Sequence, residues 1–332
     1  MISLFVYPFL ISLFTLMAII YFSHKHDLFI DDAEHSKPQN YHSVSTPRAG
    51  GLGIILGMFF ITIFPLGLNF ILPITLAFFS GIFEDFNNSL SARRRLFLQI
   101  LAALSAIWLT GSVVTYLGLG ISIPYWAGVI FSLFAIVGMM NAVNIIDGFN
   151  GLASGIILLI LLSFAITSYE QNNMEILTIV LSTAGATLGF FTLNFPKGKI
   201  FLGDGGAYLL GFIVAIIGIF LASKYESVSP WYIFSIFIYP VWEVLFSIMR
   251  KLYIGLSPMQ PDAYHFHMLV YRQITHSNPL TALFIIGSTL PFMTVSTIFP
   301  NKSTTNIAIS CCFILYYSIL YYYLYKKDTR KI

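Results

Sequence analysis

The sequence predicts an all-α protein that crosses a membrane many times. Apolar residues make up 57% of its 332 residues and charged residues only 9%, whereas about a quarter of a typical soluble domain is charged. The mean hydropathy is +0.83. About eleven apolar runs follow one another along the chain, and most approach the roughly 20 residues that a membrane-spanning helix needs.

Short connections separate these runs and leave no room for a soluble domain, so we expect residues 1–332 to form one polytopic membrane domain. Pro240 is expected to kink one of the spans, and Glu243 follows about one turn later. The expected spans are 2–23, 50–66, 70–84, 96–113, 125–141, 152–168, 176–194, 206–222, 231–250, 279–298 and 306–325.

The basic residues predict the orientation of these spans. If the connections alternate between the two sides, all 17 Lys and Arg except Lys224 and Lys302 fall on one side. Connections rich in Lys and Arg stay in the cytoplasm, so we expect the N-terminus outside and the C-terminus in the cytoplasm. The net charge of +3 then reflects orientation and contact with anionic membrane lipid, and no nucleic-acid partner is predicted.

The segment Asn141–Gly151 carries amides and a carboxylate between two apolar runs. Asn141, Asn144 and Asp147 are each three residues apart, which places them on one slowly drifting stripe of a helix. Gly148 then allows the chain to turn and its backbone to approach a ligand closely. Polar side chains at the end of a membrane-length helix need partners, so we expect a functional site here.

Two other expected cytoplasmic connections combine charged residues with a helix end. In the first, Arg48 precedes Gly50-Gly51, which indicates either close backbone packing or an anion-binding helix start. In the second, Glu84 and Asp85 end an apolar run, and the triplet Arg93–Arg95 follows. This second pattern fits an ion-pair cluster at a helix end, or a metal-facing or proton-accepting carboxylate with cations for phosphate.

The last two cytoplasmic connections add a carboxylate and two histidines. Asp204 stands among glycines where a helix is expected to begin, either as a cap or as a ligand. His265 and His267, accompanied by proline, aspartate and arginine, are either surface histidines or groups with an anion-binding or acid–base role.

Three connections therefore bring carboxylates to one face of the membrane, with few soft ligands nearby. Hard carboxylate oxygens favour Mg²⁺, or Mn²⁺, over Zn²⁺. Mg²⁺ held by one or two carboxylates beside cationic side chains is typical of a site for a pyrophosphate substrate. On a membrane protein this arrangement indicates a soluble nucleotide-activated donor and a lipid phosphate acceptor.

Five separate motifs occur in a fixed order between residue 42 and about residue 272. They are His42…Thr46-Pro-Arg-Ala-Gly-Gly51, Gly81-Ile-Phe-Glu-Asp85, Asn141…Asn144…Asp147-Gly-Phe-Asn-Gly151, Phe201-Leu-Gly-Asp204 and Pro261-Asp-Ala-Tyr-His265-Phe-His267. In this order they resemble the motifs of the polyprenyl-phosphate N-acetylhexosamine-1-phosphate transferases of glycosyltransferase family 4. The superfamily also includes phospho-MurNAc-pentapeptide transferase.

The resemblance implies a reaction in which undecaprenyl (polyprenyl) phosphate attacks the β-phosphate of a UDP-amino sugar. The products are polyprenyl-diphosphate-sugar and UMP, and Mg²⁺ is the expected cofactor. This reaction would initiate a cell-envelope polysaccharide of the O-antigen, capsule or teichoic-acid type, on the cytoplasmic face of a bacterial inner membrane.

The resemblance also implies roles for individual residues. Asp204 is expected to be the principal Mg²⁺ ligand, with Asn144 and Asp147 near the metal and the nucleotide. Asp85, together with Glu84, is expected to position or deprotonate the lipid phosphate. The other expected contacts are Asn150 and Asn194 toward the uridine or sugar, Arg95, His265 and His267 against the diphosphate, and Arg48 and Asn141 in the substrate site.

Because a lipid phosphate is already largely ionised at pH 7, we expect charge neutralisation and alignment to outweigh general-base catalysis. The chain departs from the family pattern at Glu84, where Asp is usual, at Met268, where a further His is common, and at Gly206-Ala207, where Gly-Ser is frequent. We interpret these departures as marks of a divergent branch whose amino sugar can differ, and not of an inactive enzyme.

Two alternatives differ from this prediction in donor or in class. The peptidoglycan enzyme, which acts on UDP-MurNAc-pentapeptide, is the alternative within the superfamily, although the Pro261–His267 pattern fits the HexNAc branch better. A membrane transporter is the alternative from another class, but transporters place charges near the bilayer midplane, often in two repeated halves. Here the carboxylates cluster at span ends without an internal repeat. The donor sugar, the glycan pathway and a homodimer stay open.

Overall fold

The computed structural model describes residues 1–26, 30–31, 46–87, 90–258, 260 and 262–329. Five positions of the predicted motifs or basic residues therefore lie outside the described residues, namely Lys37, His42, Pro261, Arg330 and Lys331. All the expected site residues, from Arg48 to His267, lie within the described residues.

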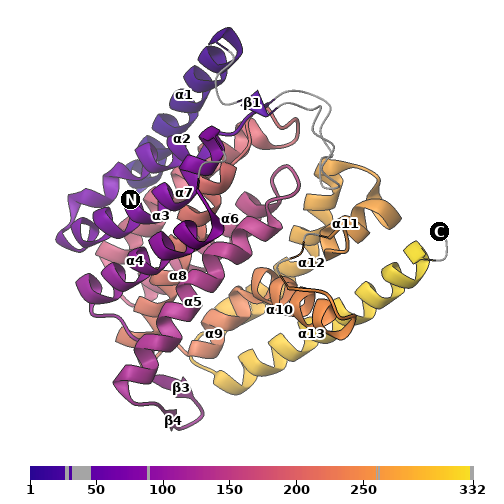
Figure 1. Ribbon diagram of the computed structural model, residues 1–332. Helices are drawn as coiled ribbons and strands as arrows, with labels where there is room; N and C mark the ends of the chain where they lie inside the picture. The colour runs from indigo at the N-terminus through magenta and orange to yellow at the C-terminus, as the bar shows by residue number, and fades with distance from the viewer. Residues whose placement is uncertain (27–29, 32–45, 88–89, 259, 261, 330–332) are drawn as a thin grey trace.

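The described residues are mostly helical, as Figure 1 shows. The helices are α1 (Ile2–His26), α2 (Gly50–Gly57), α3 (Pro65–Asn87), α4 (Ala92–Thr110), α5 (Tyr125–Ile146), α6 (Leu152–Glu170), α7 (Met174–Asn194), α8 (Gly203–Lys224), α9 (Pro230–Ile236), α10 (Ile238–Tyr253), α11 (Phe266–Val270), α12 (Asn278–Ile298) and α13 (Ser303–Thr329). A 3₁₀ segment, Met58–Ile63, continues α2, and a π-helical segment, Tyr271–Thr275, continues α11.

Two small antiparallel ribbons complete the secondary structure of the described residues. β1 (Ile30–Asp31) pairs with β2 (Thr46–Pro47), and β3 (Tyr116–Gly118) pairs with β4 (Ile121–Ser122). The first ribbon lies at one end of the helices and the second at the opposite end (Figure 1).

The prediction of an all-α polytopic membrane protein is confirmed. Among the described residues, eight helices are long and apolar enough to cross a membrane, or nine if the bent pair α9 and α10 forms one span. The count is below the expected eleven at two places. The run 50–66 forms a helix of eight residues followed by the 3₁₀ segment, and the run 96–113 lies in α4, which carries three arginines in its first turn.

The expected kink in the span 231–250 is also confirmed. The axes of α9 and α10 differ by 78°, and Phe237 lies between them. Pro240 has no N–H to donate to the carbonyl of Ile236, so a continuous helix would lose a hydrogen bond here. The bend places the start of α10, with Glu243, inside the protein.

Helix α8 forms the centre of the fold. Of its most apolar 18 residues 94% are buried, compared with 17% for α1 at the periphery. Both α3 and α5 pack along α8. A Cβ at Gly211 would lie 2.7 Å from the carbonyl oxygen of Met139, so only glycine allows α5 to approach this closely. The first residues of α8 therefore occupy a position that several helices share.

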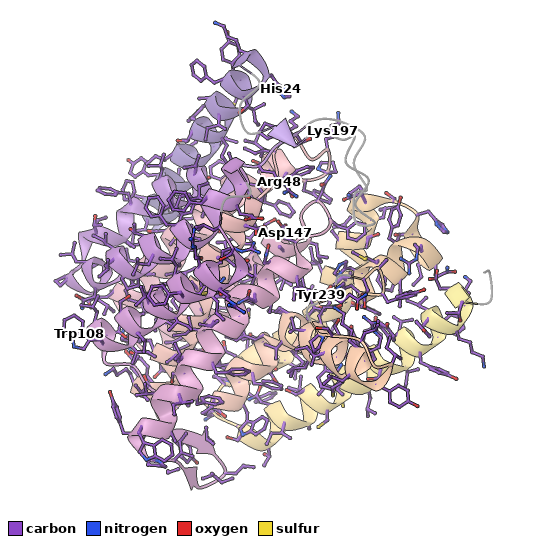
Figure 2. The ribbon with its side chains drawn as sticks, in the orientation of Figure 1. His24, Arg48, Trp108, Asp147, Lys197 and Tyr239 are labelled. Carbon is purple, nitrogen blue, oxygen red and sulfur yellow. The ribbon has the colours of Figure 1, made fainter. Side chains whose placement is uncertain are left out.

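Two of the basic residues, Arg48 and Lys197, lie toward the same end of the helices. Figure 2 shows His24, Arg48 and Lys197 toward the end that carries β1, and Trp108 toward the other end. For Arg48 and Lys197 this placement is the one that the sorting of the basic residues predicts. The orientation of that end toward the cytoplasm stays a prediction.

Candidate active site

The end of α3 meets the beginning of α8 without side chains between them. A Cβ at Gly81 would lie 2.3 Å from the carbonyl carbon of Asp204, and a Cβ at Gly205 would lie 3.0 Å from the nitrogen of Ile82. Gly203, at φ +76°, turns the chain into α8. Because the two backbones touch, the carboxylates at the end of α3 lie directly beside Asp204.

Asp85 caps α8 from another helix. Its two carboxylate oxygens accept the backbone N–H of Asp204 at 2.8 Å and that of Gly205 at 2.9 Å. The first N–H groups of a helix have no partner within the helix and carry partial positive charge, so a carboxylate is well suited to them. The bond that Asp85 makes therefore fixes the backbone of Asp204.

Arg95 joins the carboxylates of two different helices. Its guanidinium donates to Oδ2 of Asp204 at 3.0 Å and lies 4.0 Å from Oε1 of Glu84. The other oxygen of Glu84, Oε2, is buried and makes no hydrogen bond among the described residues. A buried carboxylate oxygen without a donor is a place where a cation would be stabilised.

Asp147 ends α5 and faces the same group. Burial raises the pKa of its carboxyl to about 7, the positive charge of Arg48 acts against this shift, and the negative charge of Asp204 reinforces it. Asp147 therefore lies within electrostatic range of both residues. Figure 2 labels Arg48 and Asp147 in this region. Near pH 7 this carboxyl is poised between its two protonation states.

Arg48 is held in place by backbone pairing with the connection that precedes α8. Arg48 forms a parallel β-bridge with Phe201, whose carbonyl accepts the N–H of Gly50 at 2.9 Å. The carbonyl of Leu202 accepts the N–H of Gly51 at 3.0 Å. The N–H groups at the start of α2 are thus used by the backbone, which favours close packing over anion binding as the role of the two glycines.

Asn141 and Asn144 have different partners although they share a stripe of α5. The amide of Asn141 donates to Gln99 Oε1 at 2.9 Å and to the Val137 carbonyl at 2.8 Å, which ties α5 to α4. The amide of Asn144 donates to the hydroxyl of Tyr208 at 3.1 Å, one turn after Asp204 in α8. This bond leaves the amide oxygen of Asn144 for another contact.

Asn150 and Asn194 are buried and bonded to backbone. The amide of Asn150 donates to the Pro196 carbonyl at 3.0 Å. Asn194 accepts the N–H of Gly151 at 2.6 Å and donates to the Ile200 carbonyl at 2.8 Å. Both residues shape the loops beside the site, and their contact with a donor stays a prediction.

His265 and His267 form a parallel stack, with ring centroids 5.4 Å apart and an interplanar angle of 2°. His267 also contacts Phe149 edge-on at 5.7 Å, directly after the turn at Gly148. Burial lowers the pKa of His267 to about 4, so its ring is neutral at pH 7. The His267 ring therefore carries no positive charge at pH 7, whereas the guanidinium groups of Arg48 and Arg95 do.

Three residues of this region were not predicted from the sequence. Tyr208 and Gln99 orient the two asparagines of α5, and Tyr317 of α13 bonds to Glu243 at 2.9 Å. Tyr208 follows Asp204 by four residues, so a search for polar residues on the same helix face would have found it. Tyr317 has no such local signal.

The oxygen-rich acidic group fits a hard divalent cation by its chemistry. Asp147, Asp204 and Glu84 supply carboxylate oxygens, and Asn144 supplies an amide oxygen, which are ligands that Mg²⁺ accepts while retaining water. Within the described residues, no three His, Cys, Asp or Glu side chains already stand in a metal-binding group. Asp204 is engaged by Arg95 instead, so its carboxylate would have to be shared or released.

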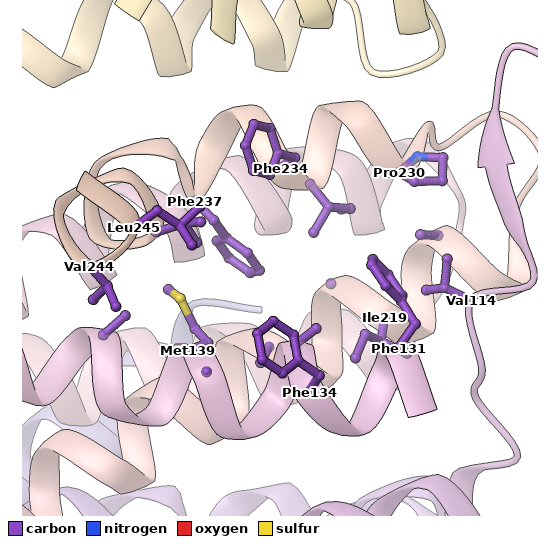
Figure 3. Close-up of a pocket in the computed structure, with 18 of the residues that line it drawn as sticks. Val114, Phe131, Phe134, Met139, Ile219, Pro230, Phe234, Phe237, Val244 and Leu245 are labelled. Carbon is purple, nitrogen blue, oxygen red and sulfur yellow. The ribbon is translucent and has the colours of Figure 1, made fainter. Parts of the chain in front are cut away.

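An apolar cavity lies farther along α5 and α8 from the polar group. Its volume is about 330 Å³, and residues of α5, α8, α9 and α10 line it. Figure 3 shows Phe134 and Met139 of α5 facing Phe234 and Phe237 across the cavity. Phe134, which is 72% exposed, belongs to this wall, so the cavity opens at the outer surface of the helices. Its lining ends at Ala142, roughly 7 Å along α5 from Asp147.

Comparison with known proteins identifies similar chains. The model of glycosyl transferase family 4 matches residues 67–222, which include Asp85, Asp147 and Asp204. The chain is 30% identical over 295 residues to the phospho-N-acetylmuramoyl-pentapeptide-transferase of Streptococcus sanguinis (strain SK36), with 78% of this chain and 86% of that protein covered.

Of two further relatives, one has a different name and the other has the same name as the first. The chain is 27% identical over 337 residues to the "probable undecaprenyl-phosphate N-acetylglucosaminyl 1-phosphate transferase" of Bacillus subtilis (strain 168), with 93% of this chain and 88% of that protein covered. It is 38% identical over 152 residues to the phospho-N-acetylmuramoyl-pentapeptide-transferase of Streptococcus mutans, with 44% of each chain covered.

Proposed function

The chain belongs to glycosyl transferase family 4, and from this premise we propose that it transfers a HexNAc-type sugar 1-phosphate from a UDP-sugar to undecaprenyl (polyprenyl) phosphate. An oxygen of the lipid phosphate forms a bond to the β-phosphorus of the donor. The bond from that phosphorus to the bridging oxygen breaks, and UMP leaves. The lipid diphosphate sugar would begin a cell-envelope polysaccharide on the cytoplasmic face of a bacterial plasma membrane.

One observation carries this proposal: acidic and basic side chains from separate segments meet at the end of α5, the helix that also lines an apolar cavity. Arg95 contacts Asp204 and lies 4.0 Å from Glu84, and Arg48 acts electrostatically on Asp147. A diphosphate needs fixed positive charge around it, and a lipid phosphate needs an apolar channel for its tail. The end of the cavity at Ala142 and the charged group at Asp147 are separated by less than about two turns of α5.

The apolar cavity supports a polyprenyl acceptor. Its lining is almost wholly apolar, it opens where Phe134 is exposed, and its inner end approaches Asp147 along α5. An isoprenoid chain entering from the bilayer would replace lipid contacts with protein contacts of the same kind. Its phosphate would then lie at the level of Arg48 and Asp147.

Mg²⁺ is the proposed cofactor, with Mn²⁺ as a substitute, and Asp204, Asp147, Glu84 and the Asn144 oxygen are the residues that would hold it. Bound there, the ion would neutralise diphosphate charge. The chain's own residues align the reactants: Arg95 and Arg48 bind phosphoryl oxygens, and Asp85 holds the backbone of Asp204. Asp85 is a positioning residue in this proposal, because each of its oxygens accepts a backbone N–H at the start of α8.

The second candidate function is transfer of phospho-MurNAc-pentapeptide. It is favoured by the 30% identity to the enzyme of that name from Streptococcus sanguinis, and it uses the same site with a different donor. The two candidates differ in what the donor carries on the sugar, and they share the acceptor and the phosphoryl chemistry.

The test is a panel of labelled UDP-sugars, including UDP-MurNAc-pentapeptide, with undecaprenyl phosphate and the purified protein in detergent or nanodiscs. We expect a lipid-linked product and UMP from one UDP-HexNAc, both lost with EDTA and with Asp204→Asn. Product from the pentapeptide donor alone would select the second candidate. If no donor yields product with the folded protein, both candidates fail.

A further inference from the structure

A fully satisfied carboxylate is buried behind the two histidines. Glu243 is 1% exposed and lies in α10, within the bent pair of helices that has membrane-spanning composition. A carboxylate there is costly unless every oxygen finds a partner. Oε1 lies 3.0 Å from Nδ1 of His265 and accepts the N–H of Phe266 at 3.1 Å, and Oε2 accepts the hydroxyl of Tyr317 at 2.9 Å.

The contact with Glu243 has a consequence for the His265 ring. A carboxylate can only accept, so Nδ1 must carry the proton in this bond. Nε2 lies on the opposite edge of the imidazole and is then left as the acceptor, or as a second donor when the ring is charged. The backbone N–H of Phe266 binds the same oxygen, so the start of α11 is fixed together with the ring.

His267 connects His265 to the predicted site, because it contacts both the His265 ring and the turn at Gly148. The two rings stack in parallel, and His267 lies against the turn after Asp147, where a Cβ at Gly148 would be 3.4 Å from Nε2 of His267. Nδ1 of His267 is buried and makes no hydrogen bond among the described residues. The ring of His267 is therefore held by contacts with other rings, His265 on its face and Phe149 edge-on.

Helix α13 holds this arrangement from the far side. Tyr317 bonds to Glu243, Tyr321 donates to the Tyr264 carbonyl at 2.9 Å, and Asp328 pairs with Arg272 at 2.8 Å. These three residues of α13 follow each other by four and seven positions, which places them on one face of the helix. Only the first of them touches the carboxylate behind the histidines, so the other two provide controls.

We propose that Glu243 is a positioning residue which, supported by Tyr317, holds His265 with its proton on Nδ1 and presents Nε2 to the phosphoryl site. The role of that Nε2 in catalysis rests on the proposed function. The tautomer itself does not, since it follows from the contact between Glu243 and His265.

The first test measures the tautomer and needs no substrate. The full-length protein in bilayers, labelled with ¹⁵N-histidine, is studied by solid-state NMR near pH 8, and His265→Gln assigns the signal. We expect His265 with a protonated Nδ1 and an unprotonated Nε2 in the native protein. In Glu243→Gln, whose amide can donate as well as accept, we expect a mixture of tautomers. An unchanged single tautomer in Glu243→Gln would overturn the proposal.

The second test separates positioning from general loss of structure. Glu243→Gln and Tyr317→Phe are expected to lower kcat about 10- to 100-fold with KM changed less than about twofold, as for groups that orient a catalytic ligand. Glu243→Asp should recover part of kcat. Asp328→Asn, which loosens the same loop without touching Glu243, is the matched control and should keep kcat within about threefold.

Equal loss of kcat in Asp328→Asn and Tyr317→Phe would also overturn the proposal, because the effect would then come from the loop as a whole. If Glu243→Gln fails to fold in a thermal melt, Tyr317→Phe decides, since it removes one hydroxyl and leaves the carboxylate bonded to His265. If the native protein shows no transferase activity, the proposed function fails, and the NMR result still decides the positioning of His265.

Discussion

The carboxylate of Asp85 accepts the backbone N–H of Asp204 at 2.8 Å, across 119 positions of the sequence. A second bond, from the N–H of Gly205 at 2.9 Å, uses its other oxygen. The two neighbouring carboxylates at the end of α3 thus differ in their hydrogen-bond partners. Asp85 is committed to the start of α8, whereas Oε2 of Glu84 is buried without a donor among the described residues.

This difference predicts opposite effects for two matched variants. Asp85→Asn keeps the shape of the side chain but can accept only one N–H, so we expect it to lower the free energy of unfolding by about 1–2 kcal/mol, as for a lost helix cap. Glu84→Gln should change stability by less than about 0.5 kcal/mol and still reduce turnover. Thermal melts in detergent and a UMP-release assay measure both. Equal destabilisation by the two variants would contradict the capping role of Asp85.

The glycine contact between α3 and α8 predicts a second effect. A Cβ at Gly81 would lie 2.3 Å from the backbone of Asp204, so Gly81→Ala must push the two helices apart. We expect this to lower the free energy of unfolding by about 1–3 kcal/mol. Gly287→Ala in α12 is the control, because nothing lies within 4 Å of its Cβ position and alanine favours a helix. We expect a lower melting temperature only for Gly81→Ala. A neutral Gly81→Ala would mean that α3 does not touch α8 at this point.

Burial of His267 predicts a dependence of stability on pH. A histidine in the unfolded chain binds a proton near pH 6.5, whereas the pKa of His267 is lowered to about 4. Between these values the unfolded state binds more protons, so stability is full above pH 6.5 and falls as the pH decreases toward 4. By pH 5 the loss attributable to this group is on the order of 2 kcal/mol.

The measurement is the change in melting temperature between pH 7 and pH 5 for the native protein and for His267→Gln. The variant should lose less stability than the native protein over this range. His24→Gln removes an exposed histidine and should follow the native curve. If the curve of His267→Gln also follows the native one, His267 is not held neutral by burial.

The apolar cavity predicts a selective effect on the acceptor. Gly138 lines the cavity, and nothing lies within 4 Å of its Cβ position, so Gly138→Phe should fill the space without displacing backbone. We expect KM for undecaprenyl phosphate to rise about tenfold or more, with little change for a polyprenyl phosphate of two isoprene units. Gly287→Phe, at an equally open position in α12, is the control. An equal rise of KM for both acceptors would place the lipid tail elsewhere.

The sequence predicted the class of fold because contact with lipid depends on composition and not on neighbours. Long apolar runs were expected as helices, and eight of them have the length and composition of spans. For the run 50–66 the prediction of a membrane span was wrong. Its apolar content resembles that of a span, but the run forms a short helix packed against α1, α7 and α8. Hydropathy does not distinguish a helix buried in protein from one that crosses lipid.

The spacing of Asn141, Asn144 and Asp147 predicted a polar stripe but not its partners. Each step of three residues turns the helix back by about 60°, so the first and last members differ by about 120°. That angle is enough for Asn141 to face Gln99 of α4 while Asp147 lies within the field of Arg48. Asn150 and Asn194, expected at the donor, hold loop backbone in the structure, and no spacing in the sequence indicated these partners.

By itself, the sequence determined that this protein is a polytopic helical membrane protein with acidic, amide and histidine motifs at the ends of its spans. These features follow from hydropathy and spacing, which each segment carries alone. Only the tertiary structure decided that Asp85 caps α8, that Arg95 pairs with Asp204 and that Tyr317 and Glu243 hold His265. The reason is that a hydrogen bond needs two groups within about 3 Å, and only the packing of helices distant in the sequence brings these pairs that close.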